Sequence, residues 1–293
     1  MKKGISVLII LISLSLLGCS TVGKPVIKSV ENRWGEITNN YTEILTEIEV
    51  YNPNPFSIPI KDVLTEVYLN SMKVGEGKSL QSEIKPKTKS TILISTKIDN
   101  EKIPKWWISH IKNGEKSMLG VKGYLIFDLR VTTFKFEISE MKRKIETNFL
   151  GFFSEKQSFD LGIYRVTVES VRTEWGDVDY NVTQIIAEFK IKNENIVPLY
   201  LKRMHYIIIV NDIVLGEGYT DVNEIVQPKS SAEIPVILNI QTQKIKDWWI
   251  SHIRNGEKSE VSIKIRQYVE IDKKKFEFEM DEMKFNFETH ILE

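Results

Sequence analysis

The sequence predicts an all-β protein: two tandem Ig-like antiparallel β-sandwich domains, each with one short amphipathic α-helix. Three observations predict this fold class. The chain contains a long internal repeat, apolar and polar residues alternate along most of it, and one segment per repeat has helical spacing instead. With 293 residues, 42% of them hydrophobic and 27% charged, the composition is that of a folded globular protein and not of a disordered one.

The repeat is clearest in a tryptophan-rich segment. Residues 106–117 (WWISHIKNGEKS) recur as residues 248–259 (WWISHIRNGEKS), with a single Lys-to-Arg difference. Shorter matches lie on both sides, such as Trp34-Gly35-Glu36 with Trp175-Gly176-Asp177. The period is far longer than the roughly 20–50 residues of solenoid repeats, so it indicates two domains. We place them at residues 25–148 and 160–293, joined by a packed linker at residues 149–159.

Alternation of apolar and polar residues predicts half-buried antiparallel strands within each copy. In the first copy these strands are residues 41–51, 63–69, 72–74, 91–98, 121–130 and 134–145. In the second copy they are residues 184–192, 204–210, 233–240, 261–271 and 276–287. Asn70-Ser71 separates two of the first-copy strands and suits a hairpin turn.

One segment per copy breaks the alternation. Ile103, Trp107 and Ile111 are spaced by four, which places them on one face of a short helix. Asn100 is the candidate cap of this helix, and Gly114 supplies the left-handed residue that ends it. The corresponding cap and stop in the second copy are Thr242 and Gly256.

The N-terminus has the pattern of an export signal. Residues 5–17 carry no charge and follow two lysines; this run is too short for a bilayer span of about 20 residues but suits a signal-peptide core. Leu16-Leu17-Gly18-Cys19 resembles the lipobox of secreted lipoproteins, and Cys19 is the only cysteine. We expect a signal peptide at residues 1–18, a lipidated tether at residues 19–24 and an extracytoplasmic protein anchored to the cell membrane. An ordinary signal peptide or an uncleaved anchor is the alternative.

Composition excludes several function classes. The 40 basic and 40 acidic residues balance, so no bulk charge favours nucleic acid as a partner. One cysteine and four scattered histidines predict no disulfide framework, metal site or cofactor. Cleavage before Cys19 removes two lysines and leaves 38 basic against 40 acidic residues. That total gives no reason to expect electrostatic attachment to anionic lipid, so the lipid itself is the expected membrane contact.

Two tryptophan–histidine pairs are the candidates for interaction. His110 and His252 each follow a tryptophan, Trp106 or Trp248, by four residues, so ring and imidazole share one side of the helix. One interpretation is a surface patch that contacts a partner; the other is a packed aromatic pair covering the sheet. Catalysis would need a nucleophile or carboxylate oriented beside the histidine, and we expect no catalytic residue and no enzyme.

Two sequons recur at equivalent positions. Asn40-Tyr41-Thr42 and Asn181-Val182-Thr183 are N-glycosylation acceptor sequences in polar turns of a protein expected to be exported. The alternative is that Asn40 and Asn181 only form the turns.

Asn52-Pro53-Asn54 follows a predicted strand, with Val74-Gly75-Glu76-Gly77 downstream. This arrangement resembles the water stress and hypersensitive response (WHy) domain, which defines the second group of late embryogenesis abundant proteins and includes archaeal and bacterial desiccation-related proteins. The second copy keeps Asn193 and Asn195 but replaces the proline by glutamate. The resemblance implies a compact Ig-like sandwich with a small helix, an association with water stress and no catalytic residues. Locally, Asn52 suits an Asx turn and Pro53 ends the strand.

Three functions follow as hypotheses. The first is an exported, lipid-anchored, non-enzymatic protein that binds a polar ligand or protects its surroundings during desiccation or osmotic stress. The second is an envelope adaptor that docks an envelope protein through edge strands or the Trp–His helices. The third is an envelope hydrolase that uses His110 or His252.

Overall fold

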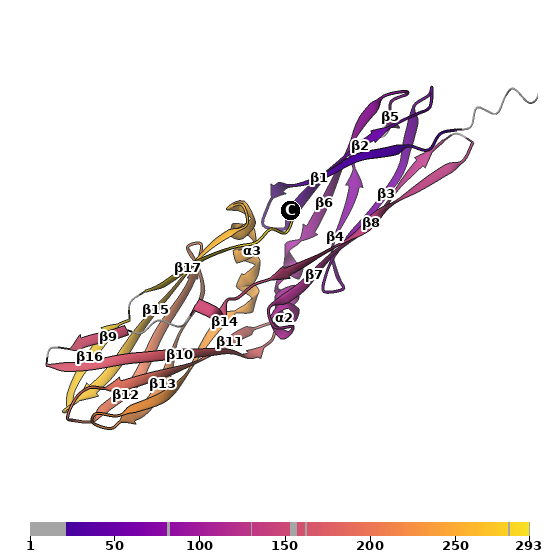
Figure 1. Cartoon of the computed structure of the whole chain (residues 1–293). Helices are drawn as coiled ribbons and strands as arrows, with labels where there is room; N and C mark the ends of the chain where they lie inside the picture. The colour runs from indigo at the N-terminus through magenta and orange to yellow at the C-terminus, as the bar shows by residue number, and fades with distance from the viewer. Residues whose placement is uncertain are drawn as a thin grey trace, which may run out of the picture.

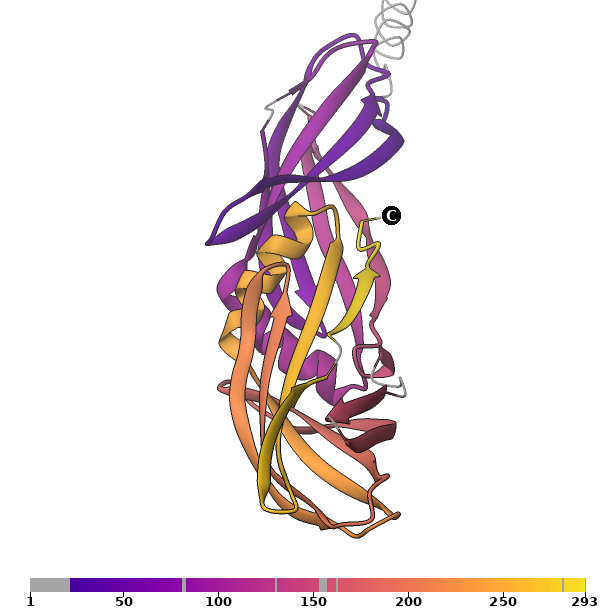
Figure 2. The ribbon, with the colours of Figure 1, turned by 90° about the vertical axis from the view of Figure 1, so that its left-hand side faces the viewer.

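A computed structural model of the chain describes residues 22–80, 83–129, 131–152, 157–161, 163–280 and 282–292. The expected signal peptide and Cys19 lie outside these described residues. The described chain forms two β-rich halves placed end to end, with two short helices side by side between them (Figure 1). A second view shows the same long, narrow outline (Figure 2). The predicted fold class, two tandem antiparallel β-sandwiches with one helix each, is confirmed.

The strands of each half pair antiparallel with strands of the same half. The first half, residues 22–148, contains β1 (Val26–Ile37), β2 (Tyr41–Tyr51), β3 (Ile58–Leu69), β4 (Met72–Ser79), β5 (Glu83–Ile84), β6 (Lys89–Asp99), α2 (Ile103–Lys112), β7 (Lys116–Asp128) and β8 (Thr133–Glu146). The second half, residues 157–293, contains β9 (Gln157–Leu161), β10 (Tyr164–Val178), β11 (Val182–Asn193), β12 (Leu199–Val210), β13 (Ile213–Val226), β14 (Ser231–Gln241), α3 (Ile245–Arg254), β15 (Lys258–Ile271), β16 (Lys274–Glu279) and β17 (Met283–Glu288). Short 3-10 turns are Asn100–Lys102, Leu150–Phe152 and Thr242–Lys244.

Strands with clean alternation are found near where we expected them, whereas the long strands β1, β10 and β13 were missed. The single strand expected at residues 276–287 is two strands, β16 and β17. Strand β2 has the predicted bounds, and its inward residues are buried. Strands β1 and β10 were missed because each contains a bulge, between Ile27 and Ser29 and between Val168 and Ser170. A bulge moves the following side chains to the opposite face, so the two-residue period is lost. The last three residues of the expected linker belong to β9.

The two sandwiches close differently along one edge. In the first half, β4 pairs with β6, so its eight strands form one sheet folded on itself. In the second half, Tyr206 replaces Thr65, and its hydroxyl accepts a hydrogen bond from the Asn239 N–H at 2.9 Å. This buried phenol occupies the edge between β13 and β14, and the described strands remain in separate sheets of four and five.

The helices end as predicted, but their expected caps are wrong. Gly114 and Gly256 follow α2 and α3 with φ of +68°, the left-handed conformation that favours glycine. Asn100 and Thr242 instead open the 3-10 turn that precedes each helix. In the first copy Asp99 is the capping residue, because its carboxylate accepts the N–H of Glu101 at 3.0 Å.

A seam between the halves explains why Asn100 and Thr242 are fully buried. Asn100 accepts a hydrogen bond from the Thr42 hydroxyl at 2.9 Å, and Thr242 lies 2.9 Å from the Thr183 hydroxyl. These groups line the facing ends of the two sandwiches. We call the region the seam and define it by Trp34, Thr42, Trp107, Trp175, Thr183 and Trp249.

At the seam, each helix inserts a tryptophan into the other half. Trp249 of α3 donates its indole N–H to Thr42 Oγ1 at 3.1 Å, and Trp107 of α2 donates to Thr183 Oγ1 at 3.1 Å. Trp249 also meets the ring of Trp34 edge-on at 6.2 Å, as Trp107 meets Trp175 at 6.2 Å. Such reciprocal contacts are those of a two-fold interface, in which the same patch serves both partners.

The hydrophobic core crosses the seam. One cluster of buried apolar residues runs from the second sandwich through both helices into the near end of the first sandwich. A separate cluster fills the far end of the first half. The halves are therefore fused copies that share a core, and neither sandwich closes its inner end with its own helix alone.

Truncating Trp249 is expected to destabilise the half to which it does not belong. The Trp249→Ala variant leaves a cavity at the end of the first sandwich and should lose about 3–5 kcal/mol of unfolding free energy. Hydrogen exchange should accelerate at the amides of β2. The matched control Ile265→Ala, inside the second sandwich, should affect β2 far less. Faster exchange limited to the second half in Trp249→Ala would contradict the shared core.

Candidate functional site

The residues that recur around the helices form a buried chain of hydrogen bonds. Ser117 Oγ accepts hydrogen bonds from Trp106 Nε1 at 2.8 Å and from Asn70 Nδ2 at 3.0 Å. With both acceptor positions used, its one hydrogen is donated to His110 Nδ1, 2.8 Å away. The imidazole hydrogen is therefore on Nε2, which donates to Thr147 Oγ1 at 2.9 Å.

This series of hydrogen bonds ends on the buried carboxylate of Glu115. Its Oε2 accepts hydrogen bonds from the Thr147 hydroxyl at 2.8 Å and the Phe149 N–H at 2.7 Å. Its Oε1 accepts from the indole of Trp175, in the other half, at 3.1 Å. Glu115 has a left-handed φ of +60° and is 6% exposed. Three donors thus satisfy a carboxylate that would be costly to bury alone, and one of them crosses the seam.

The second half repeats every link of this chain. The sequence of donors and acceptors is Trp248 to Ser259, Ser259 to His252, His252 to Thr289, Thr289 to Glu257, and finally Trp34 to Glu257 across the seam at 2.9 Å. Each series of hydrogen bonds ends on a glutamate of its own half that also accepts a tryptophan N–H from the other half. The two glutamates therefore hold the halves together in both directions.

The surface-patch interpretation of the tryptophan–histidine pairs is wrong. Trp106 is 2% exposed and Trp248 4%, and both imidazoles are sealed from solvent. Each pair packs with ring centroids 5.3 and 5.4 Å apart, as the second interpretation stated. Both histidines do touch hydroxyl groups, but a substrate cannot reach them, because no open face of either ring remains.

Burial lowers the pKa of His110 and of His252 to about 4. The hydrogen-bond pattern supports the same direction. A second proton on Nδ1 of His110 would point at Ser117 Oγ, whose acceptor positions are already occupied. The neutral imidazole is therefore part of the folded seam.

Thr147 and Ser117 are parts of this arrangement that the sequence interpretation did not include, and the position of Glu115 just past the helix could not be related to His110 from the sequence. Ser117 and Glu115 lie in the repeated twelve-residue segment, so the repeat carried a signal for both. Thr147 and Thr289 are also related by the repeat offset. The hydrogen bonds from Trp175 to Glu115 and from Trp34 to Glu257 join residues far apart in the sequence, so no local sequence pattern indicates them.

The asparagine motif is structural in both copies. Asn52 Oδ1 accepts the Asn54 N–H at 2.9 Å, which is the expected Asx turn. Asn54 in turn holds the backbone of Gly23 through two hydrogen bonds of 2.8 Å, one to N–H and one to C=O. Asn193 and Asn195 repeat this geometry on the backbone of Arg165. Since Glu194 replaces Pro53 without changing it, the two asparagines define the turn.

The sequon threonines have a second use. Thr42 and Thr183 are fully buried, and their hydroxyls accept the seam tryptophans. Asn40 and Asn181 are exposed. The repeated threonine is thus required by the seam itself, and glycosylation of either asparagine stays a prediction.

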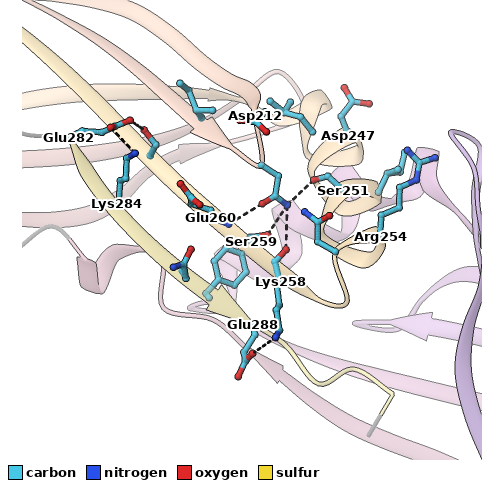
Figure 3. A pocket seen from close by; sticks show the side chains of 18 of the residues that line it. Asp212, Asp247, Ser251, Arg254, Lys258, Ser259, Glu260, Glu282, Lys284 and Glu288 are labelled. Carbon is cyan, nitrogen blue, oxygen red and sulfur yellow. Dashed lines mark hydrogen bonds and ion pairs between the residues drawn. The ribbon is translucent and has the colours of Figure 1, made fainter.

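A polar groove of about 1150 Å³ lies beside α3 in the second half. Figure 3 shows acids and bases together along its walls. Glu282 lies 3.0 Å from Lys284 and 3.5 Å from Lys264, and Lys258 lies 3.9 Å from Glu288. Hydrogen bonds from Ser262 and Lys284 lower the pKa of Glu282. The groove offers donors and acceptors of both signs to a polar ligand.

Among the described residues, no group of three or more His, Cys, Asp or Glu side chains could hold a metal ion. No helix in the same residues is long and apolar enough to cross a membrane.

Comparisons with known proteins match both halves. Residues 47–141 and 188–283 match the family model described as late embryogenesis abundant protein. A crystal structure of an Archaeoglobus fulgidus protein is 30% identical over 43% of this chain and 99% of its own, with a TM-score of 0.41. The solution structure of an Arabidopsis thaliana protein is 20% identical over 44% of this chain and 85% of its own, with a TM-score of 0.31. No curated protein matches the chain.

The buried histidines predict an acid-sensitive fold. Their pKa is about 4 in the folded chain and 6.5 when exposed, so the unfolded chain binds more protons between these values. The free energy of unfolding should fall with falling pH by about 1.4 kcal/mol per pH unit for each histidine.

Urea denaturation at several pH values measures this slope. The His110→Gln, His252→Gln double variant should show a smaller slope between pH 6.5 and 4. The control His290→Gln, at an exposed position, should keep the wild-type slope. An unchanged slope in the double variant would show that other groups cause the acid sensitivity.

Proposed function

We propose, starting from the fact that the chain belongs to the late embryogenesis abundant protein family, that it protects the cell envelope during desiccation or osmotic stress. In this proposal both halves are WHy-type domains. The mature protein is exported, anchored by a lipid on Cys19, and non-enzymatic. The observation that carries the proposal is the family match in both halves, which links the whole rod to a stress-related family.

The geometry of the seam supports a passive role. The groups with the best hydrogen-bonding chemistry, His110, Glu115 and their counterparts, are buried and fully used in joining the halves. The described residues that remain exposed include many paired charges and the polar groove beside α3. Such a surface suits contact with hydrated solutes and macromolecules and not chemical turnover.

The position of the N-terminus supports an anchored rod. Asn54 fixes Gly23 at the end of the first half that lies away from the helices (Figure 1). Gly23 lies four positions after Cys19, and an extended chain of that length spans at most about 14 Å. A lipid on Cys19 would therefore keep this end close to the membrane and direct the second half outward.

A second function, docking of an extended partner segment, is favoured by one observation. The outer edge of β10 is covered by β9, whereas β1 pairs only with β2 among the described residues. An unpaired edge can accept a partner strand. Charged side chains such as Lys28 and Glu31 on β1 discourage nonspecific pairing at this edge.

Survival of drying and salt shock tests the proposal. A deletion strain should lose viability, and the wild-type gene should restore it. Cys19→Ser should restore it poorly, because the unlipidated protein leaves the membrane, whereas the neighbouring Ser20→Ala should act as wild type. Mass spectrometry of the mature N-terminus reports lipidation independently.

Two outcomes would count against it. A deletion strain that survives like its parent would contradict the protective role, and a mature protein that retains Met1 would contradict export. Val30→Pro, which alters the exposed edge of β1, should leave survival unchanged; a loss of survival there would favour the docking function.

A further inference from the structure

The balanced total charge hides a strong asymmetry between the halves. The first half, residues 22–148, carries 20 basic and 16 acidic residues, a net charge of +4. The second half, residues 157–293, carries 17 basic and 23 acidic residues, a net charge of −6. Because the halves lie end to end (Figure 2), the half with the net positive charge and the half with the net negative charge are separated along the rod.

Exposed lysines gather at the far end of the first half. We call this end the basic tip and define it by the residues around Asn54, the β5–β6 connection and the β7–β8 turn. Its exposed lysines are Lys24, Lys61, Lys85, Lys87 and Lys89, against the exposed acids Asp62 and Glu83. Asn54 connects the parts, because its C=O accepts the Lys87 N–H at 3.0 Å and its side chain holds Gly23, next to Lys24.

One hollow in the basic tip has the chemistry of a phosphate site. It has a volume of about 720 Å³ and is lined by Lys85 and Lys89, by Ser79, Ser90 and Thr91, and by Leu80 and Glu83. Ammonium and hydroxyl donors are the groups that bind phosphate oxygens. Lys89 also pairs with Glu49 at 2.8 Å, so Lys85 supplies the less compensated charge.

An apolar side chain projects from the same tip. Val131, in the β7–β8 turn, is 80% exposed, and Pro55 in the asparagine turn is exposed as well. Basic residues around a small apolar projection are typical of surfaces that rest on the headgroup region of a bilayer.

We infer that the basic tip lies directly on the anionic headgroups of the membrane and holds the rod upright. This inference rests on the proposed location at the membrane and adds a second contact to the lipid on Cys19. A basic contact next to the tether adds to the attachment that the lipid provides. The negative second half is repelled by the same surface, which sets the orientation of the rod.

Vesicle binding tests the inference without the lipid anchor. The chain from Ser20 onward retains every contact described for residues 22–292 and lacks the anchor. It should sediment with vesicles of phosphatidylcholine and phosphatidylglycerol but not with phosphatidylcholine alone, and added salt should release it. Absence of binding to the anionic vesicles would overturn the inference and leave the survival experiment unaffected.

Two matched variants distinguish the effect of the lysines in the basic tip from the effect of the protein's net charge. Lys24→Gln, Lys85→Gln, Lys87→Gln should lower the vesicle partition coefficient about 100-fold, roughly fivefold for each lysine. The control, Lys229→Gln, Lys274→Gln, Lys275→Gln, removes the same charge from the opposite end. Lys229 is the counterpart of Lys87, since its N–H bonds to Asn195 as that of Lys87 bonds to Asn54. Equal losses in both variants would contradict the assigned face.

Site-specific labelling tests the orientation. The chain from Ser20 contains no cysteine, so Val131→Cys and Ile196→Cys each give one attachment point for an environment-sensitive dye. Both positions are about equally exposed, at 80% and 82%, on opposite tips. The dye at position 131 should shift to shorter wavelength on anionic vesicles and the dye at position 196 should not. A shift at both positions, or only at position 196, would overturn the upright orientation.

Discussion

The structure depends on the exchange of two tryptophans across the seam. Trp107 and Trp249 each close the inner end of the opposite sandwich and donate an indole N–H to a threonine there. In this protein the inner end of each sandwich is covered by its own helix and by the helix of the other half. Placing the two copies against each other therefore covers both inner ends, since each helix covers the neighbouring core.

The polar chains give this apolar contact its register. Glu115 and Glu257 accept hydrogen bonds from their own half and from a tryptophan of the other half. A shift of one half along the other would leave a buried carboxylate without a donor, which costs far more than the loss of apolar contact alone. The seam therefore specifies one relative placement and makes the two copies a single rod. In the proposed function, this single placement would let an anchor on the first half position the second half.

Sequence patterns predicted those parts of the fold that repeat at short range. Strand β2 was predicted to the residue because one of its faces is continuously buried, and the helices because their apolar residues recur every three or four positions. The bulged strands β1 and β10 were missed for the opposite reason. The seam could not be predicted, because Thr42 and Trp249 are 207 positions apart and no local period connects them. The repeat still indicated that both tryptophans of each pair matter, although not that they serve different halves.

Charge was interpreted at too coarse a level. The near-neutral total gave no reason to expect electrostatic contact with lipid, yet the two halves carry opposite net charges that the fold separates along the rod. The sequence gives the net charge of each half, and the end-to-end placement of the halves shows that these charges are separated along the rod. Conversely, the sequon at Asn40 gains a structural explanation through Thr42, whose hydroxyl is used in the seam.

A double-mutant cycle between Trp249→Phe and Thr42→Val tests the central claim most directly. Both substitutions keep most of the apolar volume and remove the hydrogen bond between Trp249 and Thr42. Thr42→Val also removes the hydrogen bond to Asn100, whose contribution cancels in the cycle. If the two copies share a core through reciprocal insertion, the unfolding free energies of the two single variants and the double variant should give a coupling of about 1 kcal/mol. Fully additive effects would mean that Trp249 does not contact the first half, and the account of a fused rod would fail.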